Sequence, residues 1–112
     1  YGISCGDTRL YHSGDCVPFE ELETLVRTYR PGLAFLPING RDAERTANGV
    51  PGNMTLDEAI ALCQACEIAR LIPHHFGMFD FNTASPPALA RAESQAPPPR
   101  LELPSPLSPI PL

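Results

Sequence analysis

The sequence lacks three features that mark large classes of proteins. It has no run rich in lysine or arginine and carries a net charge of -5 at pH 7, so we do not expect a nucleic-acid partner. No apolar stretch approaches the roughly 18 consecutive residues that a membrane span needs, so we expect no membrane contact. It shows neither an internal repeat nor a secretory signal. The remaining possibilities centre on a small-molecule substrate.

The chain is short for an independent domain. It has 112 residues and begins with Tyr1 rather than Met, so we expect a fragment or a processed product. A chain of this size buries only a modest part of its surface. Prolines crowd residues 96–112, which we expect to form an extended, disordered tail. The expected folded domain is therefore 1–95.

Four cysteines do not make this chain a disulfide scaffold. Cys5, Cys16, Cys63 and Cys66 lie within segments whose apolar patterns indicate strands and helices. Buried, reduced thiols suit such positions, and reduced thiols are typical of cytosolic proteins. We therefore expect a cytoplasmic location.

The order of strand and helix patterns predicts an α/β fold with helices covering a sheet. Apolar residues at helical spacing follow Pro18, which suits the first turn of a helix, and Thr55 with Glu58 forms a capping box at the start of another. Residues 39–53 form a long polar loop, and loops of that length are more often functional. The predicted elements are a hairpin over 2–5 and 9–12, helices over 18–30, 55–69 and 86–95, and strands over 33–38 and 70–72, the last ended by Pro73.

Three polar residues follow predicted strands. Asp15 lies just after the strand 9–12, and His74 and His75 follow the strand 70–72. A turn or a helix cap is the simpler interpretation of Asp15. The functional interpretation is a carboxylate and an imidazole presented at the carboxyl edge of the sheet, where ligands of open α/β sheets gather. Sequence spacing alone does not say which histidine faces such a site.

Two further groups have both a structural and a functional interpretation. Cys63 and Cys66 have the spacing of a metal or redox motif, but they fall inside a predicted helix, which favours core packing. Asn39, Arg41 and Arg45 lie in the long loop, which is either simply solvated or faces an anionic substrate through its arginines.

Three short motifs, in order, resemble those of metallo-β-lactamase-fold hydrolases. The segment Tyr-His-Ser-Gly-Asp over 11–15 is similar to the strand and Ser-Gly-Asp motif of the L-ascorbate-6-phosphate lactonase group. Asn-Met-Thr over 53–55 resembles that group's Lys/Asn-Met-Thr/Ser segment, and Ile-Pro-His-His over 72–75 resembles its Ile-Pro-x-His motif. The resemblance covers about residues 1–87.

The resemblance implies a fold and a site. The fold is a four-layer αβ/βα sandwich, of which this chain would be the second αβ half. Asp15 would bridge two divalent metal ions, and His75 would bind one of them, while His74 takes the variable position. Zinc, manganese and iron all suit carboxylate and imidazole ligands. The family's His-x-His-x-Asp-His motif, which supplies most of the metal ligands, is absent from this chain.

The expected function is metal-dependent hydrolysis of a lactone or ester, with the chain as a fragment of the enzyme. The substrate would be a small molecule, anionic if the loop arginines bind it, and a homo-oligomer is compatible with the sequence. One alternative is a non-catalytic remnant or an interaction module that binds through its proline-rich tail. Another is a small zinc domain that uses Cys63, Cys66, His74 and His75.

Overall fold

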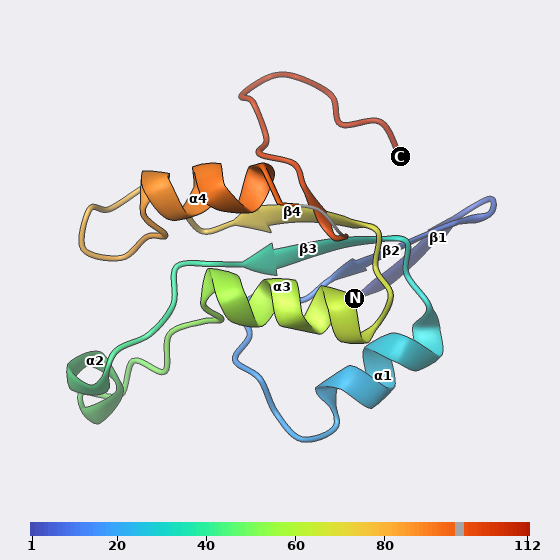
Figure 1. Ribbon diagram of the computed structural model, residues 1–112. Helices are drawn as coiled ribbons and strands as arrows, with labels where there is room; N and C mark the ends of the chain where they lie inside the picture. Colours follow the sequence, from blue (N-terminus) through green and yellow to red (C-terminus); the bar gives the residue numbers. More distant parts are fainter. Residues whose placement is uncertain (96–97) are drawn as a thin grey trace.

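The computed structural model describes residues 1–95 and 98–112 and shows an α/β fold in which one sheet carries several helices (Figure 1). The hairpin and the alternation of strands and helices appear in the predicted order. The elements are β1 (Gly2–Cys5), β2 (Thr8–His12), α1 (Leu22–Tyr29), β3 (Leu33–Pro37), α2 (Ala43–Ala47), α3 (Leu56–Ala65), β4 (Arg70–His74), α4 (Pro86–Glu93) and β5 (Arg100–Leu101).

The strands form a single sheet in the order β1-β2-β3-β4-β5. β1 and β2 are antiparallel, whereas β2, β3, β4 and β5 are parallel to one another. Parallel strands end at the same edge of a sheet, so the segments that follow β2, β3 and β4 meet there. In Figure 1 this is the edge to which the arrows of β3 and β4 point, on the side of α2.

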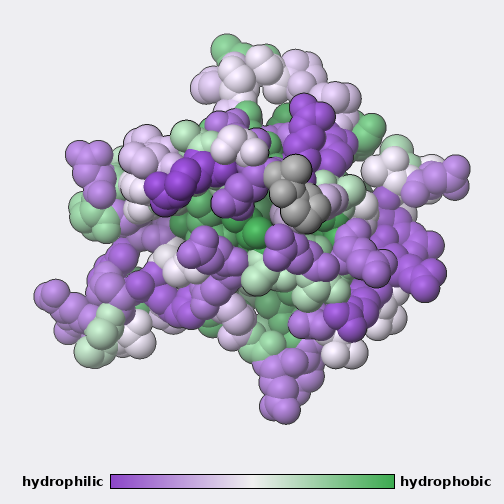
Figure 2. Space-filling view, in the orientation of Figure 1, coloured by the Kyte–Doolittle hydropathy of each residue, from purple (hydrophilic) through white to green (hydrophobic). Residues whose placement is uncertain are grey.

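The core lies between the helices and one face of the sheet. Ala34 of β3 pairs with Leu71 of β4, which pairs with Leu101 of β5, so the three side chains share a face. They belong to one buried cluster with apolar residues of α1, α3 and α4. Figure 2 shows apolar residues gathered in the seam between α3 and α4, beneath a largely polar outer surface.

Helix α1 begins four residues later than expected. Pro18 precedes it without regular structure, and the helix starts at Leu22 with no side-chain cap at Glu21. The backbone N–H of Met54 donates to Cys16 O at 2.8 Å, which ties the chain before Pro18 to another loop. Val17, the residue before Pro18, is also a poor helix cap, because it has no side-chain oxygen to accept from a first-turn N–H.

Helix α3 ends at Ala65 rather than near Ala69. Its capping box is confirmed: Thr55 Oγ1 accepts from Glu58 N, and the Glu58 side chain accepts from Thr55 N. At the other end of the helix, Ile68 N donates to Cys63 O. Glu67, which has a left-handed backbone, donates its N–H to Gln64 O. That arrangement is a Schellman motif, and it terminates the helix.

Pro73 does not end β4, contrary to expectation. The strand continues through it to His74. Leu71 O accepts a hydrogen bond from Glu102 N beside β5, so Pro73, two residues further on, faces the same side. Strand β5 pairs only with the first two residues of β4, so the missing N–H of Pro73 breaks no ladder bond.

The predicted disorder of the tail is wrong at Arg100–Leu101, which form β5. Leu101 is only 6% exposed, because it completes the core beside β4. Glu102 accepts two hydrogen bonds from Arg70, at 2.9 and 3.0 Å, and Arg70 also donates to Pro111 O. The predicted start of the tail, at 96–97, lies outside the described residues, so the division at residue 95 stays a prediction.

Two smaller expectations also changed. The loop over 39–53 contains a short helix, α2, capped by Asp42, whose side chain accepts from Arg45 N. Cys5 is exposed on β1, whereas Cys63 and Cys66 are buried as expected; the described structure contains no disulfide among the four.

No helix in the described residues has the length and apolar character to cross a membrane.

Candidate metal centre

Asp15 and His75 meet at the carboxyl edge of the sheet. Asp15 follows β2 by three residues, and His75 is the first residue after β4. His75 Nδ1 lies 3.0 Å from Asp15 Oδ1, with the two side chains 47% and 73% exposed. This contact leaves His75 Nε2 and the second Asp15 oxygen available as metal ligands. The two residues singled out from the sequence are therefore brought together.

The backbone is arranged to present both side chains. Gly14 has a left-handed φ of 63°, and its N–H donates to His12 Nδ1 at 3.0 Å, which fixes the turn before Asp15. His75 itself has a φ of 56°. A non-glycine residue in this region is uncommon and carries strain, which tends to persist at functional sites.

His74 has different surroundings from His75. Its ring stacks on His12 with centroids 4.9 Å apart and meets His75 edge-on at 4.7 Å. Burial, with smaller contributions from the two neighbouring histidines, lowers the pKa of His74 to about 4. Its Nε2 atom is buried and has no hydrogen-bond partner among the described residues. A neutral imidazole packed against the sheet is the role that these contacts support.

Asn53 is a residue of this edge that the sequence did not single out for chemistry. It is 6% exposed, which makes it the buried polar residue of the described core. Its Oδ1 accepts from Cys16 N at 2.8 Å, and its Nδ2 lies 3.5 Å from His75 Nδ1. Its only signal in the sequence is its place in the segment Asn-Met-Thr, which says nothing about burial.

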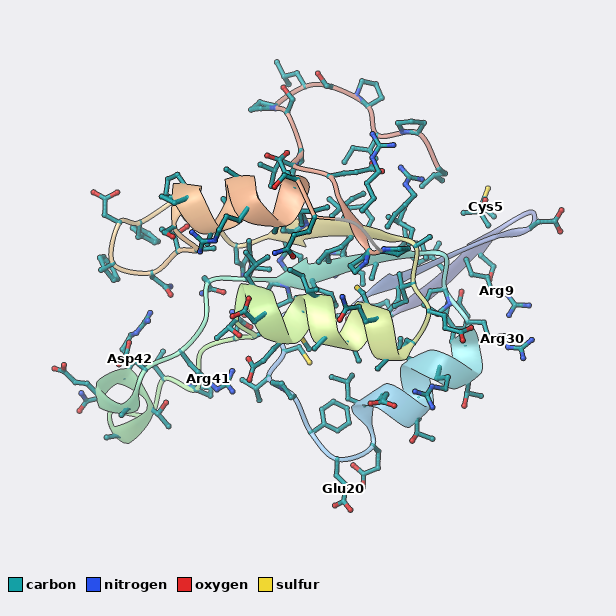
Figure 3. The ribbon with its side chains drawn as sticks, viewed as in Figure 1. Cys5, Arg9, Glu20, Arg30, Arg41 and Asp42 are labelled. Carbon is teal, nitrogen blue, oxygen red and sulfur yellow. The ribbon has the colours of Figure 1, made fainter. Side chains whose placement is uncertain are left out.

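The loop residues proposed to bind substrate are engaged within the protein. Arg41 donates to both carboxylate oxygens of Glu58, at 2.5 and 2.6 Å, and to a backbone carbonyl. Arg45 pairs with Asp42. Figure 3 shows Arg41 and Asp42 on the loop that carries α2, at the opposite end of the molecule from Cys5.

Asn39, the third of these loop residues, contacts the loop after β4. It comes just after β3, and its Nδ2 donates to Asn82 Oδ1 at 3.1 Å. This bond joins the loop after β3 to the loop after β4. Asn39 Oδ1 is buried without a partner in the described structure, so one acceptor at this edge remains unsatisfied. A substrate-binding role for the three loop residues stays a prediction.

The donor set fits part of a metal site. A carboxylate and an imidazole in contact are ligands that zinc, manganese and iron accept. Within residues 1–95 and 98–112, however, no group of three or more His, Cys, Asp or Glu is placed to hold a metal ion. Further ligands would have to be added to Asp15 and His75 to complete a site.

The zinc domain made of two cysteines and two histidines is contradicted. Cys63 lies near the end of α3, where its carbonyl accepts from Ile68 N just before β4. His74 is at the other end of that five-residue strand, about 13 Å from the strand's first residue at the usual rise per residue. Burial also raises the pKa of Cys63 to about 12, which disfavours the thiolate that binds metal.

Comparison with known proteins identifies the family. Residues 1–76 match the beta-lactamase superfamily domain. The chain therefore belongs to the beta-lactamase superfamily, and the expected metallo-β-lactamase type of α/β fold is confirmed. A metallo hydrolase from the hyperthermophilic archaeon Ignicoccus hospitalis has a similar structure, with a TM-score of 0.57 and 24% identity. The similarity covers 79% of this chain and 34% of that one, and at this identity it shows the fold alone.

Curated relatives carry the name UPF0173 metal-dependent hydrolase. The protein from Myxococcus xanthus is 31% identical over 80 residues, which cover 71% of this chain and 25% of the relative. The protein from Solibacter usitatus is 34% identical over 87 residues, which cover 77% of this chain and 34% of the relative. The chain thus spans about a quarter to a third of the length of these relatives.

Proposed function

We propose that this chain supplies one side of the active site of a metal-dependent hydrolase. The contact between Asp15 and His75 at the carboxyl edge of the sheet carries the proposal. The names of the curated relatives support it, because each describes a metal-dependent hydrolase. The ligands still needed would come from a part of the enzyme that these 112 residues do not contain.

The residues of the chain have separate tasks in this proposal. When bound, two divalent ions would activate a water molecule and stabilise the negative charge that develops on the substrate. Asp15 would help to hold the ions through its carboxylate group. His75 would hold one ion through Nε2, while its Nδ1 stays oriented by its neighbours, as is usual for metal-binding histidines. Zinc, manganese and iron each suit these ligands.

The substrate would be a small molecule with a lactone or ester group, as the resemblance to the L-ascorbate-6-phosphate lactonase group suggests. An anionic substrate has less support than the sequence implied, because Arg41 and Arg45 are paired with carboxylates. The loop after His75 instead exposes two stacked aromatic rings, Phe79 and Phe81, whose centroids are 5.5 Å apart. We propose that this loop contacts an apolar part of the substrate.

Two further expectations remain proposals. A cytoplasmic location is supported by the free cysteines, which suit a reducing compartment. The alternative of a non-catalytic remnant or an interaction module is favoured by one observation: the described residues present only two converging ligands.

The test is metal content and turnover in the full-length product of the gene. We expect the Asp15→Asn variant to lose at least one metal equivalent and most of its hydrolysis of a panel of lactones and esters, because an amide nitrogen ligates metal poorly. Asp7→Asn is the matched control, since Asp7 is an exposed carboxylate in the hairpin turn. If Asp15→Asn keeps its metal and its turnover, the chain is not part of such a site.

A further inference from the structure

Asn53 is an unusual residue for a surface loop because its side chain is buried. It is 6% exposed, although it lies three residues before the first residue of α3 and follows two glycines with a positive φ, Gly49 and Gly52. A buried amide is costly unless its polar atoms have partners. The role of Asn53 therefore depends on which groups its polar atoms contact.

The first partner is the residue that follows Asp15. Asn53 Oδ1 accepts from the backbone N–H of Cys16 at 2.8 Å, and the N–H of Met54 donates to Cys16 O, also at 2.8 Å. The peptide groups on both sides of Cys16 are thus held by one short segment. Asp15 is one bond away from the held N–H, so this clamp sets where the carboxylate is presented.

The second partner is the imidazole of His75. With Oδ1 committed to Cys16, the amide nitrogen of Asn53 is the atom that faces His75, at 3.5 Å from Nδ1. Asp15 Oδ1 lies 3.0 Å from the same ring nitrogen. When Nδ1 carries the proton it donates to Asp15 Oδ1, and Asn53 Nδ2 then contacts the same nitrogen without donating to it. The two neighbours together turn Nε2 away from themselves.

Asn53 is itself held on its far side. Its N–H donates to Gly40 O at 3.0 Å, and its carbonyl accepts from Arg41 Nη1 at 3.1 Å. Arg41 is fixed in turn by the bidentate pair with Glu58, which also closes the capping box of α3. The amide is thereby anchored to the rigid start of a helix as well as to the loop after β3.

From this geometry we infer that Asn53 is the positioning residue of the site, joining the loops that carry Asp15 and His75 to the start of α3. The inference rests on the proposed function, because it concerns the same two ligands. Asn53 does not bind metal in this role. It fixes the distance and orientation of two side chains that are otherwise exposed.

The main test compares zinc affinity in the full-length gene product. We expect Asn53→Ala to bind zinc at least about tenfold more weakly, in the range usual for residues that orient metal ligands. Asn53→Asp keeps an oxygen for Cys16 N but replaces the amide nitrogen beside His75, so it should bind zinc more weakly than the unaltered protein and more tightly than Asn53→Ala. Affinity is measured by competition with a chromophoric chelator, and the Co²⁺ absorption spectrum reports the ligand geometry.

Two controls separate positioning from general stability. Asn48→Ala removes an exposed asparagine of the same loop and should change nothing. Leu62→Ala removes a core side chain of α3 and should lower the thermal midpoint without changing zinc affinity. If Asn53→Ala and Leu62→Ala bind zinc equally well, or if Asn53→Asp is as weak as Asn53→Ala, the positioning role is overturned.

A metal-free measurement keeps the inference distinct from the proposed function. Nuclear magnetic resonance of the 112-residue chain reports the Cys16 amide and the His75 ring without any ion. We expect Asn53→Ala to shift both signals and to speed exchange of the Cys16 N–H, while Asn48→Ala shifts neither. Unchanged signals overturn the inference. If the unaltered full-length protein binds no zinc, manganese or iron, the proposed function fails, and these signals still decide the role of Asn53.

Discussion

His74 and His75 are adjacent in the sequence, yet their imidazoles have different environments. The His74 ring stacks on His12 and buries Nε2, whereas His75 is 47% exposed and faces Asp15. We expect His75→Ala to weaken one bound metal ion selectively and His74→Ala to lower stability while sparing metal. Metal analysis and thermal unfolding of both variants check this. The reverse pattern would show that the ligand is one residue earlier than we have assigned.

Glu67 has a left-handed backbone, with a φ of 57°, at the position after α3 where glycine is usual. A side chain in that region costs roughly 1–2 kcal/mol. We expect Glu67→Gly to raise the free energy of unfolding by about 1 kcal/mol. The relief of backbone strain in the folded chain outweighs the extra freedom that glycine gains in the unfolded chain. Chemical denaturation measures the change. A decrease would mean that the Glu67 side chain makes a compensating interaction.

At the residue scale, the sequence predicted Asp15 and His75 because each follows a strand within a recognisable motif. It could not predict Asn53, since nothing in a polar loop signals that one amide will be buried against Cys16, 37 residues away. The arginines illustrate the same limit. Arg41 seemed free for a substrate because its partner, Glu58, lies 17 residues further along the chain.

At the scale of elements, apolar patterns together with turn, cap and proline signals predicted every strand but β5, along with α1, α3 and α4. The predicted boundaries are wrong where a contact with a residue distant in the sequence determines them. The link from Met54 to Cys16 delays α1, and the absence of a β5 partner opposite Pro73 lets β4 continue. Strand β5 has only two residues, and its apolar signal is a single leucine among prolines, too little for a sequence pattern to detect.

The short strand β5 should nevertheless contribute to stability. Leu101 is 6% exposed and Leu107 is fully exposed, although both lie in the proline-rich part of the sequence. We expect Leu101→Ala to lower the free energy of unfolding by about 2 kcal/mol or more, in the usual range for a buried leucine. Leu107→Ala should change it by less than about 0.5 kcal/mol. Equal effects would mean that the tail does not pack as described.

The loop over 39–53 is joined to α3 by an ion pair that should make stability sensitive to acid. The hydrogen bonds from Arg41, above all other causes, lower the pKa of Glu58 from 4.5 to about 2. The unfolded chain therefore takes up a proton that the folded chain does not, so this stabilisation is complete above pH 4.5 and is lost as the pH falls toward 2. We expect Glu58→Gln to flatten the decline in stability over that window, measured by denaturation at several pH values.

For the whole molecule, the sheet has an edge that is poorly protected. β1 has one neighbour, β2, and all four of its residues are exposed. A free strand edge offers unpaired N–H and C=O groups to another chain. Beside it lies an apolar hollow of about 290 Å³ lined by Gly2, Tyr11 and residues of α1. This end of the molecule therefore combines a free strand edge with an apolar hollow, and both favour association with another chain.

We expect the 112-residue chain to self-associate through β1 as its concentration rises. Ile3, at the centre of β1, is 53% exposed, and a lysine there would place a charge on the edge, which natural sheets use to block pairing. Sedimentation velocity should show Ile3→Lys shifted toward the monomer. Val50→Lys is the matched control, because Val50 is 49% exposed but lies on the loop after α2. An unaltered chain that stays monomeric at high concentration would contradict the expectation. Equal shifts in the two variants would attribute association to general surface charge rather than to the strand edge.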